Sequence, residues 1–250
     1  MAMKKIFLLM VLFTSLGASA QIFSLGLKAD AGSVVTTYGT NTILTDNNWS
    51  NEWHGVIGLN AYTRILGLER LQASTGLGLG LSNYRLRTGW DLTNDVLSEQ
   101  QSSLYSYTAY RIVRKNMQLV VPMDIRLKLI STRGFLANHN FYLTGGLIWR
   151  INVNNTENIY AIEEQGNYES NDFEASATFK NNLNDYFSGE FTSQNLLAAV
   201  GFERGRSLTG VELIYSFKYI WNLSSMTKDL KINNSGGIQA GIGIRFGNFR

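Results

Sequence analysis

A regular alternation of apolar with small or polar residues constrains the fold of this chain more than any other feature. Between Leu71 and Ser82 the sequence reads Leu-Gln-Ala-Ser-Thr-Gly-Leu-Gly-Leu-Gly-Leu-Ser. Successive residues of a strand point to opposite faces of a sheet, so this segment presents one apolar face and one small, polar face. Similar segments recur along the chain and predict a protein built from strands.

Eight strands are predicted from this alternation. They span residues 23–34, 53–65, 71–87, a segment ending in 117–130, 141–153, 195–204, 209–221 and 237–247. Glycine is abundant, with 24 residues, and proline occurs once, which suits strands in close contact. After the N-terminal segment, no apolar run is long enough for a membrane-spanning helix.

The links between these strands alternate in length. Short links lie at 67–70, 131–138 and 205–207, and long polar segments lie at 36–52, 88–115, 154–194 and 224–235. Outer-membrane barrels combine short periplasmic turns with long outer loops, and an even strand number leaves both termini in the periplasm. We therefore predict an all-β fold: an eight-stranded antiparallel up-and-down transmembrane β-barrel with long extracellular loops and short periplasmic turns.

A soluble barrel of the lipocalin type would show the same alternation, with its leucines pointing inward. That alternative does not explain why short and long links are segregated, and a loop as long as 154–194 is unusual in a small soluble barrel. The transmembrane interpretation also predicts a bulge or a local ladder break beside Pro122, which has no N–H to donate. It further predicts that six side chains face lipid: Leu71, Leu77, Leu79, Leu127, Leu143 and Ile242.

The N-terminus has the features of an export signal. Lys4 and Lys5 precede an apolar segment, and cleavage is predicted between Ala20 and Gln21, which gives a signal peptide at 1–20 and a barrel domain at 21–250. The chain has no cysteine, so neither a disulfide nor a lipid-anchored N-terminus is expected. Cleavage of this signal peptide would remove Lys4 and Lys5 and leave 20 of the 22 basic residues against 19 acidic ones. This charge balance gives no basis for nucleic-acid binding.

In such a barrel the polar faces of the strands line the lumen. Eight strands enclose a space just wide enough to be filled by side chains, so the charges there are expected to pair and to close it. A functional polar path is the alternative, whereas a general porin needs a wider barrel. The predicted lumen charges are Lys28, Asp30, Arg64, Asp124, Arg126, Lys128, Arg150, Glu203, Glu212, Lys218 and Arg245.

The two histidines give little support for an enzyme. His54 is predicted near the outer end of its strand and His139 at the periplasmic start of another, so they cannot act together; a pairing of His54 with Ser50 remains open. Glu163 and Glu164 lie in the longest polar segment, where a solvated surface is expected. We therefore expect no catalytic residue, no metal site and no cofactor.

Aromatic residues concentrate in and beside the predicted outer loops. In a membrane barrel they would form part of an interfacial girdle or pack within the loops, and a binding surface is the alternative. They are Trp49, Trp53, Trp90, Tyr105 and Tyr107.

Three segments resemble the PorT-like outer-membrane β-barrel family of Bacteroidota. Met117-Gln-Leu-Val-Val-Pro-Met-Asp-Ile-Arg-Leu-Lys128 resembles its Ile-Pro-Leu-Leu-Leu-Lys-Tyr strand, 195–222 resembles its paired glycine-rich and Glu-Leu-Arg-Tyr strands, and 241–246 resembles its closing strand. The chain departs from the family pattern by Asp124 and Arg126 within the proline strand, and by four residues after Phe246.

The resemblance implies a structural or accessory outer-membrane barrel of a Gram-negative bacterium. Because the namesake of the family belongs to a secretion apparatus, envelope assembly or protein secretion is the implied process. The expected partners are outer-membrane lipid, the barrel-assembly machinery during biogenesis and a protein partner, with no nucleic acid. A small-solute channel or a barrel that binds a surface ligand remains the alternative.

Overall fold

The computed structural model describes residues 23–39, 48–65, 68, 70–91, 107–134, 137–165, 168–173, 192–208, 210–225 and 230–247. The predicted cleavage site at Ala20 and Gln21 lies outside these residues, as does Tyr105. The strands are β1 (Phe23–Gly39), β2 (Asn48–Arg64), β3 (Leu71–Asp91), β4 (Tyr107–Arg133), β5 (Asn138–Gln165), β6 (Tyr168–Phe173), β7 (Gln194–Leu208), β8 (Val211–Asn222) and β9 (Lys231–Phe246).

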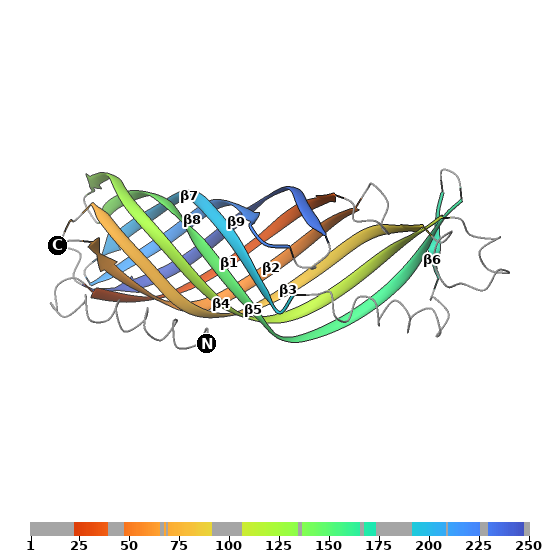
Figure 1. Ribbon diagram of the computed structural model, residues 1–250. Helices are drawn as coiled ribbons and strands as arrows, with labels where there is room; N and C mark the ends of the chain where they lie inside the picture. Colours follow the sequence, from red (N-terminus) through yellow and green to blue (C-terminus); the bar gives the residue numbers. More distant parts are fainter. Residues whose placement is uncertain are drawn as a thin grey trace.

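Eight of these strands form a closed antiparallel ring (Figure 1). Each strand of the ring pairs with the next ring strand along the chain. β6 lies outside the ring and pairs with β5, so the ring continues from β5 directly to β7. The ring closes between the first and last strands, where Leu25 of β1 lies opposite Phe246 of β9. The predicted eight-stranded up-and-down barrel is therefore confirmed, and all eight predicted strands are present.

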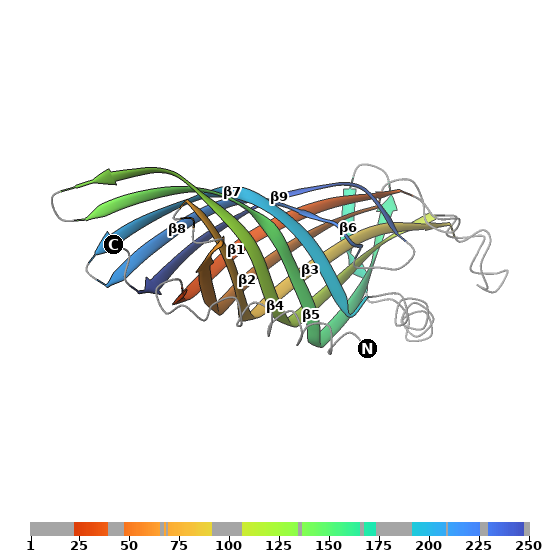
Figure 2. The ribbon, with the colours of Figure 1, turned by 60° about the vertical axis from the view of Figure 1, so that its left-hand side comes forward.

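The strands extend further than predicted at the end with the long loops. Residues 88–91 and 107–115 belong to β3 and β4, and β5 continues to Gln165, where it pairs with β6. The prediction of continuous loops at 88–115 and 154–194 is therefore wrong in part, because polar composition hid the alternation in these segments. In Figures 1 and 2, β4 and β5 project beyond the ring, and β6 lies beside the far end of β5.

At the opposite end, short turns connect the strands. Residues 134–137 connect β4 to β5, and 209–210 connect β7 to β8. Gly210 has φ = 76°, in the left-handed region that glycine adopts at little cost, and its carbonyl accepts a 3.2 Å hydrogen bond from the amide of Gly247. The start of β1 and the end of β9 lie at this end, so the predicted segregation of short and long links is present.

The barrel has its apolar side chains outside and its polar side chains inside. Exposed fractions reach 61% for Leu79 and 53% for Ile242, while the neighbouring inner face carries buried charges such as Arg126 and Glu212, both at 0%. A soluble barrel would show the reverse arrangement. All six side chains predicted to face lipid lie on the outer face, five of them exposed and Leu71 half-buried. No helix within the described ranges is long and apolar enough to cross a membrane.

Arginine at Leu77 is expected to test this inside-out arrangement. Leu77 lies in the middle of the apolar outer face of β3, so Leu77→Arg should lower the free energy of unfolding by about 2–4 kcal/mol in lipid vesicles. Asn83→Arg, six residues along the same face and above the apolar band, is the matched control and should cost about 0–1 kcal/mol. Equal costs at both sites would contradict a lipid-facing exterior.

The single proline interrupts one ladder without shifting the register. Between β3 and β4 the pairing runs to Gly78 and Val120 and resumes at Thr75 and Met123, so Pro122 has no ladder partner on β3. On its other side Pro122 pairs in regular register with β5. The predicted ladder break is thus present on one side, without a bulge, because the missing N–H is needed on only one side of the strand.

Candidate functional site in the barrel lumen

Glu203 on β7 lies at the centre of an ion-pair network in the half of the lumen nearest the short turns. Its Oε2 accepts a 2.6 Å hydrogen bond from Nε of Arg126, and its Oε1 accepts one of 3.2 Å from Nζ of Lys28. Lys28 Nζ also lies 3.3 Å from Oδ1 of Asp30. All of these side chains are buried or nearly so, which makes their pairing a condition for keeping them ionised inside the barrel.

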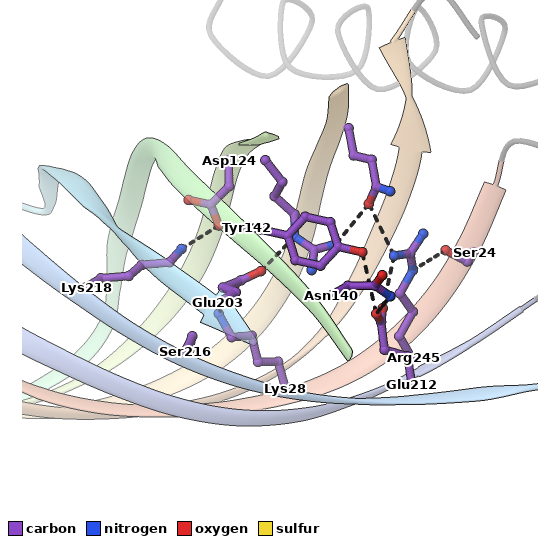
Figure 3. Close-up of polar contacts among 12 residues, drawn as sticks. Ser24, Lys28, Asp124, Asn140, Tyr142, Glu203, Glu212, Ser216, Lys218 and Arg245 are labelled. Atoms are coloured by element: carbon purple, nitrogen blue, oxygen red, sulfur yellow. Dashed lines mark hydrogen bonds and ion pairs between the residues drawn. The ribbon is translucent and has the colours of Figure 1, made fainter. Parts of the chain in front are cut away.

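A second carboxylate, Glu212 on β8, extends the network (Figure 3). It accepts hydrogen bonds of 3.2 Å from Nη1 of Arg245 and 3.1 Å from Nδ2 of Asn140. The side-chain oxygen of Gln72 connects the contacts of Glu203 with those of Glu212, because it accepts hydrogen bonds from Arg126 at 3.0 Å and from Arg245 at 3.2 Å. The polar contacts therefore run continuously across the lumen.

Two tyrosine rings pack against the guanidinium groups. Arg126 Cζ lies 4.2 Å from the ring centre of Tyr142 and 4.9 Å from that of Tyr62, and Arg245 Cζ lies 4.8 Å from the Tyr62 ring. Such contacts stabilise a desolvated cation and fill space that water would otherwise occupy. With Tyr62 on β2, every strand of the ring contributes a side chain to this cross-section.

An apolar layer follows the ion-pair network along the inner faces. It is formed by Val34, Val120, Ile148, Leu197, Ala199 and Ile220, with Val56 packed against them. On β8 the inner positions run from Lys218, whose Nζ lies 2.7 Å from Asp124 Oδ2, directly to Ile220, which is 0% exposed. An apolar constriction excludes water as well as ions.

A second polar layer lies beyond the apolar layer, toward the long loops. Arg150 Nη1 donates a 2.9 Å hydrogen bond to Glu52 Oε1, and both side chains are almost fully buried. Tyr38 Oη lies 3.0 Å from the hydroxyl of Ser50 and 3.1 Å from that of Tyr84. The lumen is thus filled by three successive layers, which are polar, apolar and polar.

A small cavity lies beside the apolar layer. Its volume is about 30 Å³, and its lining includes His54, Asp124 and Gln239. That space is enough for water but not for a solute. Within the described residues, both ring nitrogens of His54 and Oδ1 of Asp124 lack a hydrogen-bond partner.

The structure brings most of the predicted lumen charges together. Within the described part of the chain, six ion pairs join five bases with five acids. Arg64 and Lys128 lie on inner faces but are half-buried, and they form no ion pair with a described residue, so the network does not include them. The paired residues are Lys28, Arg126, Arg150, Lys218 and Arg245 with Asp30, Glu52, Asp124, Glu203 and Glu212.

Glu52 was missed by the sequence analysis. It was placed in the predicted loop 36–52, although Ser50, Glu52 and His54 continue the alternation of the next strand in register. The structure includes all three on the inner face of β2. Extending the alternation of β2 back to Ser50 would therefore have identified Glu52 as a lumen residue that could pair with Arg150.

The structure separates the residues considered for catalysis. His54 is 5% exposed inside the lumen, and the hydroxyl of Ser50 lies near Tyr38 rather than near that ring. His139 lies at the start of β5 on the opposite end, where its Nδ1 is 3.4 Å from Nη2 of Arg204. The described residues contain no group of three or more metal-ligating side chains.

Comparisons with solved structures find bacterial proteins that align with most of this chain. Neisserial surface protein A is 10% identical, covers 90% of this chain and 97% of its own, and has a TM-score of 0.32. The attachment invasion locus protein Ail of Yersinia pestis is 12% identical, with coverages of 90% and 99% and a TM-score of 0.29. The translocator domain of the autotransporter NalP from Neisseria meningitidis is 10% identical, with coverages of 98% and 95% and a TM-score of 0.25. No protein-family model and no curated protein matches the sequence.

The fold assignment rests on the closed ring itself. A barrel with an apolar exterior and a polar, filled interior satisfies every ladder hydrogen bond within lipid, which an open sheet cannot do. Barrels of this strand number, with short turns at one end and long loops at the other, span bacterial outer membranes. The protein is accordingly an integral β-barrel of the bacterial outer membrane.

Proposed function

We propose that this protein is a non-conducting outer-membrane barrel with a structural or accessory role in envelope assembly or protein secretion. The observation that carries the proposal is the filled lumen, in which ion pairs from around the ring and an adjoining apolar layer leave no path for a solute. A barrel closed in this way acts through its outer wall and its extracellular end. The proposed role is not enzymatic, and it requires no cofactor.

Two further features support a protein partner. The segments that resemble PorT-like proteins belong to four strands of the ring, β4, β7, β8 and β9. The namesake of that family belongs to a secretion apparatus. On the extracellular side, β3, β4 and β5 continue past the apolar band, and β6 widens this projecting sheet at its end. A sheet that projects outside the membrane offers backbone and side chains for docking.

Site-specific photo-crosslinking in native cells tests this proposal. A photoreactive residue at Glu164, in the β5–β6 hairpin, should give a discrete protein adduct, whereas one at lipid-facing Leu79 should give none. A deletion strain should correspondingly lose a defined subset of surface or secreted proteins. The same adducts at both positions, or no adduct at Glu164 with an unchanged surface proteome, would contradict an accessory role.

A small-solute channel is the second candidate. It is favoured by the small polar cavity beside the apolar layer, since rotation of a few side chains there would connect the two polar layers. Barrel conductance distinguishes the two candidates.

A further inference from the structure

A depression lies on the outer wall formed by β2, β3, β4 and β5, at the edge of the apolar band nearest the extracellular end. Its volume is about 480 Å³, and Trp53, Leu81 and Met117, which are 62%, 68% and 42% exposed, line it. Gly55 contributes no side chain, and a Cβ built there would meet nothing within 4 Å. The depression is therefore open on the lipid-facing side of the wall.

A bulge shapes one side of this hollow. In the β4–β5 ladder, Met117 pairs with Asn154 while Gln118 pairs with Asn152, so Val153 is an extra residue. A bulge of this kind bends and twists the strand that carries it. The bend lies beside the depression, and both Met117 and Asn154 line it.

The residues around the hollow form two rows, the first apolar except for Asn154 and the second polar except for Trp53. Gly55, Leu81, Met117 and Asn154 pair across the four strands in one row. The next row toward the extracellular end consists of Trp53, Asn83, Lys115 and Thr156. The first row belongs to the depth of acyl chains, and the second to the depth of headgroups.

Two exposed bases lie in the polar part of this wall. Lys115 lies in the headgroup row, and Arg85 lies one row further out, opposite Asn51 and Val113. Among the described outward-facing residues of these rows there is no acidic side chain. Among these described residues the wall therefore carries only positive charge, next to the apolar hollow on its extracellular side.

We propose that this hollow binds a phosphate-bearing lipid of the outer leaflet. An acyl chain lies over Gly55 against Leu81 and Met117, and the phosphate is bound by Lys115 and Arg85. Lysine and arginine are the side chains suited to phosphate, and both hold long apolar stems along the wall while their charges reach the headgroups. The proposal rests on the position of the barrel in the membrane and does not depend on whether the lumen conducts.

Quenching of tryptophan fluorescence by brominated lipid tests the site in the refolded, vesicle-reconstituted protein. The Trp53 signal is the difference between the unaltered protein and its Trp53→Phe variant. Two mixtures are compared: brominated phosphatidylglycerol in phosphatidylcholine, and brominated phosphatidylcholine in phosphatidylglycerol. The preference is the ratio of the association of the two brominated lipids with Trp53. It should be at least five-fold in favour of phosphatidylglycerol, since each base near an anionic surface contributes about a five-fold preference. Unlabelled lipid A should relieve the quenching, whereas inorganic phosphate should not.

Matched variants separate a built site from diffuse surface charge. Lys115→Gln with Arg85→Gln should reduce the preference to about one, and Lys115→Arg should retain it. Lys231→Gln removes an exposed base of β9 at the same end of the barrel and should leave the preference unchanged. Gly55→Leu should fill the hollow without a clash and should reduce quenching of Trp53 by either lipid.

Three outcomes would overturn the proposal. They are a preference that survives the double substitution, an equal loss in Lys231→Gln, and unchanged quenching in Gly55→Leu. Each variant is first shown to be folded by the mobility difference between heated and unheated samples on a gel, so a loss of preference cannot be attributed to a loss of the barrel.

Discussion

Replacing Glu203 by alanine is expected to lower the free energy of unfolding by about 3–5 kcal/mol, the usual cost of removing one partner of a buried ion pair. The side chain accepts hydrogen bonds from Arg126 and Lys28, which are 0% and 6% exposed. Both cations would remain in the lumen without their shared carboxylate. Unfolding by urea in lipid vesicles, monitored by fluorescence and by gel mobility, measures the change.

A double variant tests whether this cost comes from the unpaired charge. Glu203→Ala combined with Arg126→Met also removes the most buried cation, so it should be less destabilising than the sum of the two single substitutions. An additive result would show that Glu203 and Arg126 stabilise the barrel independently, and that the ion pair seen between them has little energetic importance.

The second large effect is expected at Glu212, which is 0% exposed and accepts hydrogen bonds from Arg245 and Asn140. Glu212→Ala should also cost about 3–5 kcal/mol and should lower the temperature at which the folded band shifts on a gel. Glu163→Ala, in the part of β5 that pairs with β6 beyond the ring, is the control and should leave that temperature unchanged. Equal shifts in both variants would contradict a sealing role for Glu212.

The strands of the ring were predictable because each crosses lipid on one face. A membrane requires an outward side chain at every second residue to be apolar, so the alternation in segments such as 71–81 and 238–246 is nearly unbroken. The segregation of short and long links indicated a membrane barrel, and the alternation then assigned Arg126, Glu203 and Glu212 to the lumen. Their individual partners depend on the stagger of strands distant in the sequence, which no local pattern contains.

The projecting parts of β3, β4 and β5 were not predictable on the same grounds. Toward the extracellular end the outer face no longer meets acyl chains, so 88–91, 107–115 and 154–165 are rich in polar residues such as Lys115 and Thr156 and have the composition of a loop. The apolar layer in the lumen was missed for a related reason. Val120, Leu197 and Ile220 lie on faces that were read as polar throughout, and only the closed ring brings them into contact.

Conductance of the refolded protein in planar lipid bilayers tests the sealed lumen most directly. Insertion is first established from the heat-dependent gel mobility of protein recovered from the same preparation. With the ion pairs around Glu203 and Glu212 intact and the apolar layer in place, we expect no stable unitary current steps at either polarity. Reproducible ohmic steps from the unaltered protein would contradict the closed lumen and would establish an aqueous path through the barrel.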